Sequence, residues 1–134
     1  MDILTPKNCT TGIAAETPVL ATGTFAGTPA DATLWVLAYG PNLLYYPQSP
    51  DACQGEPPIQ EGGVWQVPLY LGKRGGAPEW FDVVVVLTDQ AASQFLSNTV
   101  KRGCQIGRYS GIPALQLNQM AIAEKGYITV QTSD

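Results

Sequence analysis

The sequence predicts an all-β domain in which two antiparallel sheets pack face to face, with one short helix. Three observations lead to this fold class. The chain of 134 residues contains 14 glycines and 11 prolines, which favours many turns between short strands. Charged residues make up only 13% of the chain, well below the usual share of about 25%. Apolar segments with strand-like alternation recur between the turns, and the length suits one domain, so residues 1–134 are predicted to form a single β-sandwich.

The first half of the chain predicts a strand followed by a hairpin. Residues 1–17 are expected to be irregular, and the strand signal begins with VLATGTF at residues 19–25, which includes β-branched side chains. TLWVLAY, residues 33–39, is apolar on both faces, which is typical of a central strand. A GPN turn leads into LLYYP, residues 43–47, where Pro47 cannot donate to a ladder and should lie at an edge or a strand end.

Two strands are predicted in the middle of the chain. GVWQVPLYLG, residues 63–72, has apolar residues at alternate positions, and Pro68 within it indicates a strand near an edge. WFDVVVVLTD, residues 80–89, has four consecutive valines, which disfavour a helix and predict the centre of a sheet. Trp35 and Trp65 lie on apolar strand faces, so we expect them to fill the sandwich core as a pair.

One helix is predicted at about residues 90–102. Asp89 can accept hydrogen bonds from the free amides of its first turn, and apolar side chains follow at helical spacing. Lys101 and Arg102 complement the helix C-terminus, and Gly103 is expected to end the helix. The next segment, QLNQMAIAE, is compatible with a short helix or a strand, and GYITVQT is predicted to close the chain as a strand.

Charge and hydropathy argue against two classes of partner. The net charge is −4, and nonspecific nucleic-acid binding needs clustered Lys and Arg, so no nucleic-acid partner is expected. No uninterrupted apolar run approaches the roughly 18 residues of a membrane span, so no membrane insertion is expected. The N-terminus lacks the features of a signal peptide, which predicts a soluble chain without a leader. A domain excised from a longer exported protein would look the same, so the compartment stays open.

The residues present argue against an enzyme. There is no histidine, which removes Ser-His and Cys-His nucleophiles and His-ligated metals. Ser97 and Lys101 could form a Ser-Lys pair, but any solvated helix face offers the same spacing. The carboxylates of Asp51, Glu56 and Glu61 lie in a polar loop without the register of a calcium site. We therefore expect no catalytic residue, no metal and no cofactor.

The cysteines leave two alternatives open. Cys9, Cys53 and Cys104 are far apart in the sequence, and this spacing excludes a metal cage of the CxxC type. One disulfide with a spare thiol and a fully reduced chain are both compatible with the sequence.

Four aromatic residues are the candidate ligand-binding residues: Tyr45, Tyr46, Tyr70 and Trp80. Tyr and Trp combine a ring that can stack on a ligand with a polar tip, and sugar-binding modules use such rings. Adjacent residues on a strand point to opposite faces, so at most one of Tyr45 and Tyr46 can face outward. Ordinary cross-strand packing is the alternative interpretation of this pair.

The segments LWVLAY, LLYYPQ, GVWQVPLYLG and FDVVVVLTD, with a helix behind the last, resemble an immunoglobulin-like β-sandwich module of bacterial multidomain or surface proteins. The resemblance covers about residues 19–132 and carries no functional residue across. It implies a noncatalytic recognition, adhesion or accessory module. Our first expectation is therefore a module that binds a protein partner. Carbohydrate binding through Tyr70, Trp80 and one of Tyr45 or Tyr46 is the alternative, and a hydrolase with a Ser-Lys or carboxylate pair comes third.

Overall fold

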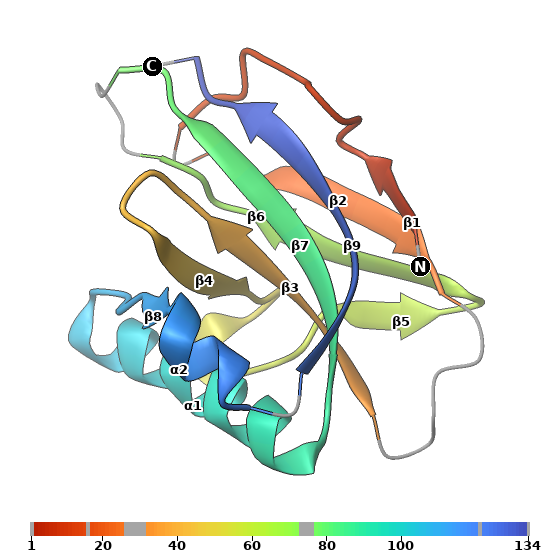
Figure 1. Cartoon of the computed structure of the whole chain (residues 1–134), viewed down its shortest axis with the longest axis vertical. Helices are drawn as coiled ribbons and strands as arrows, with labels where there is room; N and C mark the ends of the chain where they lie inside the picture. Colours follow the sequence, from red (N-terminus) through yellow and green to blue (C-terminus); the bar gives the residue numbers. More distant parts are fainter. Residues whose placement is uncertain (1, 16, 26–31, 73–76, 121, 134) are drawn as a thin grey trace.

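The computed structural model describes the whole chain except residues 1, 16, 26–31, 73–76, 121 and 134 (Figure 1). Its strands form two antiparallel sheets, which confirms the expected two-sheet, mostly antiparallel arrangement. The four-stranded sheet has the order β1 (Asp2–Thr5), β2 (Val19–Thr24), β6 (Val64–Leu69), β5 (Ile59–Glu61). The five-stranded sheet has the order β8 (Ile112–Pro113), β4 (Leu44–Gln48), β3 (Thr33–Tyr39), β7 (Trp80–Thr88), β9 (Ile122–Gln131). The helical elements are the 3-10 helix η1 (Ala52–Gln54), α1 (Gln90–Ile106) and α2 (Ala114–Asn118).

The two strands predicted to be central are central. β3 lies between β4 and β7, and β7 lies between β3 and β9. β3 and β4 form the expected hairpin, in which Tyr39 lies opposite Tyr45. Pro68 pairs with Leu20 of β2 and lies beyond the part of β6 that β5 pairs with. Within the described part of the chain, β6 therefore has a partner strand on only one side at Pro68. Because proline has no N–H to donate to a second strand, this position suits it.

The helix begins where expected and ends later than expected. The carboxylate of Asp89 accepts a hydrogen bond from the N–H of Ala92 at 2.8 Å, which caps α1. Gly103 lies inside the helix rather than at its end, and α1 continues to Ile106. Gly107, in the left-handed region at φ 72°, ends the helix by donating its N–H to the carbonyl of Gly103.

Two other segments also differ from the expectation. Part of the N-terminal segment that was expected to be irregular forms β1, which pairs with β2. The ambiguous segment QLNQMAIAE is divided between α2 and the start of β9, so both of its alternatives are present. β9 then pairs along the whole of β7 and forms an outer strand of the five-stranded sheet.

Two hydrophobic cores lie on the two faces of the five-stranded sheet. The sandwich core lies between the sheets and contains Trp65, whereas the helix-side core lies between the five-stranded sheet and α1 and contains Trp35. Both side chains are fully buried. The expectation that they form one pair was wrong. Trp35 lies on the face of β3 opposite to Leu34 and Val36, and only that other face meets the four-stranded sheet.

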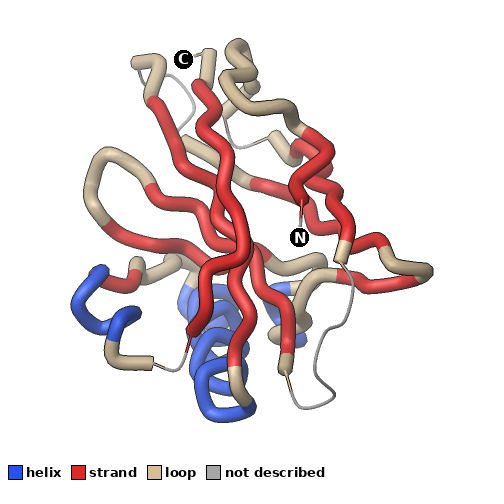
Figure 2. Tube along the Cα trace, turned by 45° about the vertical axis from the view of Figure 1, so that its right-hand side comes forward, coloured by secondary structure: helices blue, strands red, loops and turns tan. Residues whose placement is uncertain are grey.

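The helices cover only part of the outer face of the five-stranded sheet. Figures 1 and 2 show α1 and α2 together at one end of the molecule. Trp80 of β7 and Tyr127 of β9 lie on the same outer face as the helix-side core, but they are 47% and 62% exposed. The outer face is therefore divided into a part under α1 and an open part.

Candidate functional site

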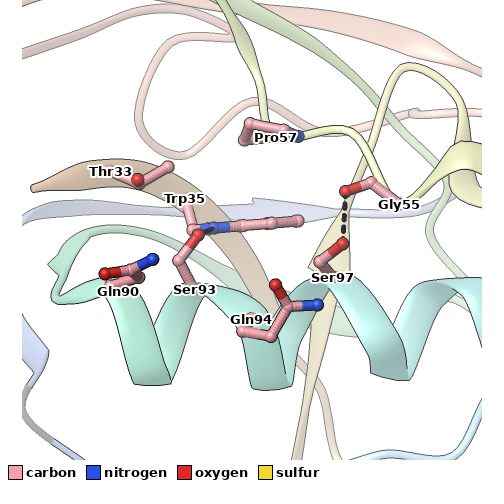
Figure 3. A pocket seen from close by; sticks show the side chains of 8 residues that line it. All are labelled: Thr33, Trp35, Gly55, Pro57, Gln90, Ser93, Gln94 and Ser97. Carbon is pink, nitrogen blue, oxygen red and sulfur yellow. Dashed lines mark hydrogen bonds between the residues drawn. The ribbon is translucent and has the colours of Figure 1, made fainter.

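A polar pocket of about 300 Å³ lies between α1 and the turn that follows η1 (Figure 3). Its lining residues are Thr33, Trp35, Gly55, Pro57, Gln90, Ser93, Gln94 and Ser97. The four residues from α1 recur at helical spacing and so share one face of the helix. Figure 3 shows the hydroxyls of Ser93 and Ser97 directed toward Trp35 and Gly55, with Pro57 on the far side. None of the lining side chains is charged.

Hydrogen bonds fix the orientation of the polar groups in this pocket. Trp35 donates its Nε1–H to Oγ of Ser93 at 2.9 Å. Ser97 donates its hydroxyl to the carbonyl of Gly55 at 2.8 Å. Gln94 donates its side-chain amide to Oδ1 of Asn98 at 3.0 Å. The hydroxyl hydrogen of Ser93, the lone pairs of Ser97, and the carbonyl and second amide hydrogen of Gln94 therefore remain for a ligand or for water.

A larger groove of about 570 Å³ lies beside β4 and the C-terminal half of α1. We call it the tyrosine groove, because Tyr46, Tyr70 and Tyr109 line it. Tyr70 and Tyr109 are 55% and 49% exposed. The rest of the lining is Pro47, Gln48, Ser49, Pro50, Asp51, Ala52, Cys53, Gly72, Thr99, Val100 and Ser110. The groove is of ordinary size for a ligand site and combines aromatic rings with a few polar groups.

Gln48 holds two strands of the groove together. Its side chain is only 6% exposed, although glutamine is usually a surface residue. It donates its amide to the carbonyl of Tyr46 and accepts the N–H of Tyr70, both at 3.0 Å. These two bonds fix the main chain at two of the three tyrosines.

Two glycines allow the tyrosine rings to pack closely. A Cβ atom at Gly103 would lie 2.1 Å from the ring of Tyr109, so only glycine leaves room for this ring on α1. A Cβ atom at Gly111 would meet Leu44 at 2.4 Å and the ring of Tyr46 at 2.9 Å. This packing explains why Gly103 lies within the helix instead of ending it.

One cysteine of a disulfide, Cys53, lines the groove. Cys53 of η1 is bonded to Cys104 of α1, across 51 residues of chain, and Cys9 is free and exposed. Of the two alternatives left open by the sequence, the structure has one disulfide and a spare thiol. The bond holds the short loop around η1 against the helix.

The open part of the five-stranded sheet carries a third set of aromatic residues. Tyr39 and Tyr45 lie opposite each other with ring centroids 4.4 Å apart. Asp82, opposite Tyr39 on β7, accepts a hydrogen bond from the hydroxyl of Thr129 at 2.9 Å. Together with Trp80 and Tyr127, described above, they form what we call the aromatic sheet face.

The four candidate residues from the sequence are divided between two surfaces. Tyr46 and Tyr70 lie in the tyrosine groove, whereas Tyr45 and Trp80 lie on the aromatic sheet face. Sequence reasoning did not select Tyr109 as a candidate. The available signal was Gly103, because a glycine inside a helix is unfavourable and often marks close packing.

The residues considered for catalysis have other partners or lie on the surface. The hydroxyl of Ser97 donates to Gly55, and the side chain of Lys101 packs over the same glycine. Asp51 accepts a hydrogen bond from the N–H of Gln54 at 3.3 Å and so caps η1, while Glu56 and Glu61 are exposed. Within the described residues, no cluster of His, Cys, Asp and Glu could hold a metal ion.

Comparison of the chain with protein-family models, with curated proteins and with solved structures finds no match. None of the helices in the described part of the chain is long and apolar enough to cross a membrane.

Proposed function

We propose that the chain is a noncatalytic recognition module that binds an extended, proline-containing segment of a partner protein in the tyrosine groove. The observation that carries this proposal is the convergence of Tyr46, Tyr70 and Tyr109 around one groove. Polyproline segments have no internal hydrogen bonds, so their carbonyls are free to accept from tyrosine hydroxyls. Their rings pack on aromatic side chains, and their preformed conformation lowers the entropic cost of binding.

The edge of β4 supports an extended ligand. β8 pairs only with Leu44 and Tyr45, so from Tyr46 to Gln48 the strand has no partner on that side within the described residues. A chain segment laid along this edge would contact the tyrosines and the prolines of the groove together. The size of the groove also fits a few residues of an extended peptide better than a globular surface.

The charge of the groove supports a basic residue beside the prolines of the ligand. Asp51 is exposed and is the one charged side chain in the lining, which contains no Lys or Arg. An Arg or Lys in the ligand would be attracted to this carboxylate, and salt would screen the attraction.

Fluorescence polarisation tests the proposal with labelled peptides that contain a Pro-x-x-Pro segment flanked by Arg or by Glu. We expect the Arg peptides to bind more tightly, and Tyr70→Ala and Tyr109→Ala each to weaken binding by about tenfold or more. Tyr127→Ala is the matched control, because this equally exposed tyrosine lies on the aromatic sheet face. The proposal fails if no peptide binds, if Tyr70→Ala and Tyr109→Ala bind as the unsubstituted chain does, or if Tyr127→Ala weakens binding as much as they do.

We also propose that the sandwich is an immunoglobulin-like variant of the kind appended to bacterial multidomain or surface proteins. The strand orders support this: β1-β2-β6-β5 corresponds to the A-B-E-D sheet, and β8-β4-β3-β7-β9 to a C-F-G sheet with two extra strands, β4 and β8. The disulfide supports an oxidising compartment. Two features distinguish the chain from a plain immunoglobulin sandwich. The helix α1 lies between β7 and β9 in the sequence, and Trp35 faces this helix.

Carbohydrate binding is the second candidate, and the aromatic sheet face is the observation that favours it. Exposed rings of Trp80 and Tyr127 flank the carboxylate of Asp82, a combination of stacking surface and hydrogen-bond acceptor that suits a sugar chain. Retention on a panel of soluble and insoluble polysaccharides tests it. Retention that Trp80→Ala loses and Tyr70→Ala keeps would favour a glycan on this face, and absence of retention would remove this candidate.

A further inference from the structure

We infer that the polar pocket beside α1 binds one neutral monosaccharide unit. This site is separate from the tyrosine groove and from the aromatic sheet face, and it goes beyond the proposed function. The inference rests on the volume of the pocket, on the absence of charge in its lining, and on the fixed directions of its hydrogen-bonding groups.

Three side chains of α1 have hydrogen-bonding groups that remain free for a ligand in this pocket. Oγ of Ser93 accepts from Trp35, so its own hydrogen remains to be donated. Oγ of Ser97 donates to Gly55, so its lone pairs remain to accept. Gln94 uses one of its two amide hydrogens on Asn98, which leaves its carbonyl oxygen as a second acceptor and its other hydrogen as a second donor. These three side chains therefore present donors and acceptors side by side along one face of a single helix (Figure 3).

These hydrogen-bonding groups suit the hydroxyls of a sugar. A sugar hydroxyl donates one hydrogen bond and accepts others, so neighbouring hydroxyls on one ring can meet a donor and acceptors that lie side by side. The ring of Pro57 lies across the pocket from α1 and offers an apolar surface to the C–H face of a sugar.

The charge and the volume of the pocket suit a small neutral ligand. The lining contains no charged side chain, so an ionic ligand would lose hydration there without gaining an ion pair. A volume of about 300 Å³ lies at the lower end of the range for small-molecule sites, which run from roughly 300 to 1,000 Å³, so it suits one ring rather than a drug-sized ligand. Buried Trp35 forms a rigid base beneath these groups.

The variants come from exposed residues, so that folding is preserved. Gln90 and Gln94 both line the pocket and both are exposed, and the double variant Gln90→Ala/Gln94→Ala removes their amides without opening a core. Gln105→Ala is the matched control, because it is an exposed glutamine of the same helix that does not line the pocket. Ser93 is left unchanged because its oxygen accepts the buried indole N–H of Trp35.

The experiment is an NMR titration of the labelled protein with glucose, galactose and N-acetylglucosamine, and with glucuronate and glucosamine as charged analogues. We expect at least one neutral sugar to shift the amide signals of residues 90–97 and of Gly55, and the double variant to bind it about tenfold more weakly than the Gln105→Ala control. The inference is overturned if no neutral sugar shifts these signals, if the shifts centre on Trp80 and Tyr127, or if the charged analogues bind equally well. The peptide assay reports on the tyrosine groove, so the two proposals can fail independently.

Discussion

The two hydrophobic cores differ in what surrounds them. The sandwich core is enclosed by two sheets, whereas the helix-side core is covered by α1. The polar pocket and the tyrosine groove both lie along this helix. The polar pocket uses residues from the N-terminal half of α1, and the tyrosine groove uses Thr99 and Val100 farther along it. The helix lies in the connection between two strands of the sandwich. The polar pocket and the tyrosine groove therefore depend on this connection, whereas the aromatic sheet face belongs to the strands of the sandwich.

The two buried tryptophans show the same contrast. Trp35 donates its indole N–H to Ser93, so its position is tied to the polar pocket. The Nε1–H of Trp65 is buried and finds no acceptor within the described residues. Packing alone holds Trp65, whereas packing and a hydrogen bond hold Trp35. This contrast predicts different costs for substitutions in the two cores.

The largest effect is expected from Trp65→Ala, which would leave a large cavity in the sandwich core. We expect it to lower the free energy of unfolding by about 3–5 kcal/mol, the usual cost of such a truncation. Urea unfolding followed by circular dichroism measures this change. The control is Trp80→Ala on the open sheet face, with an expected change within about 0.5 kcal/mol. Equal effects of the two variants would contradict the assignment of Trp65 to an enclosed core.

The second largest effect is expected from removal of the disulfide that joins η1 to α1. Cys53→Ala/Cys104→Ala should lower the free energy of unfolding by about 2–4 kcal/mol, because the bond closes 51 residues of chain in the unfolded state. It should also weaken peptide binding, since Cys53 lines the tyrosine groove. Urea unfolding and fluorescence polarisation measure the two changes. Cys9→Ser, which alters the exposed free thiol, should change neither, and a loss of stability in this control would indicate that Cys9 contributes to folding.

Much of the sandwich could be predicted from the sequence, because strand alternation depends on local pattern. The central positions of TLWVLAY and the valine-rich strand followed from apolar residues on both faces. The predicted pairing of Trp35 with Trp65 was wrong, because both faces of the strand that carries Trp35 are apolar. The sequence of such a strand does not reveal which face meets a sheet and which meets a helix.

The candidate sites were less predictable, because they bring together residues that are distant in sequence. Tyr46, Tyr70 and Tyr109 meet only through the docking of α1 on β4 and η1, a tertiary event without a local signal. Gln48 looks like an ordinary loop residue in the sequence, and its role depends on burial. The position of Gly103 in the helix was also missed, because the usual rule for glycine at a helix end competes with its use in close packing.

Replacing each buried tryptophan by phenylalanine sharpens the contrast between the cores. Both variants remove volume, but Trp35→Phe also removes a hydrogen bond, whereas Trp65→Phe removes an N–H that has no acceptor within the described residues. We therefore expect Trp35→Phe to lower the free energy of unfolding by about 1 kcal/mol more than Trp65→Phe. Urea unfolding of the two variants in parallel measures the difference. A larger loss for Trp65→Phe would mean that its indole has an acceptor after all.

The smallest change in stability is expected from Gly103→Ala, where two effects oppose each other. Alanine favours the helix over glycine by about 1 kcal/mol, but its Cβ would meet the ring of Tyr109 at 2.1 Å and displace it. The net change in the free energy of unfolding should stay within about 1 kcal/mol, while peptide affinity should fall as it does in Tyr109→Ala. Gly107→Ala is the converse control. At φ 72° with open space around it, this substitution strains the helix end by about 1 kcal/mol and leaves Tyr109 in place.

Thermal unfolding and fluorescence polarisation on these two glycine variants separate stability from binding. Lower affinity in Gly103→Ala with unchanged affinity in Gly107→Ala would show that the position of the Tyr109 ring, rather than the stability of α1, controls the groove. Unchanged affinity in both variants would mean that the ring can move without loss of binding, and Tyr109 would then no longer belong to the ligand site. A parallel loss in both would assign the effect to the helix end as a whole, because Gly107 touches no groove residue.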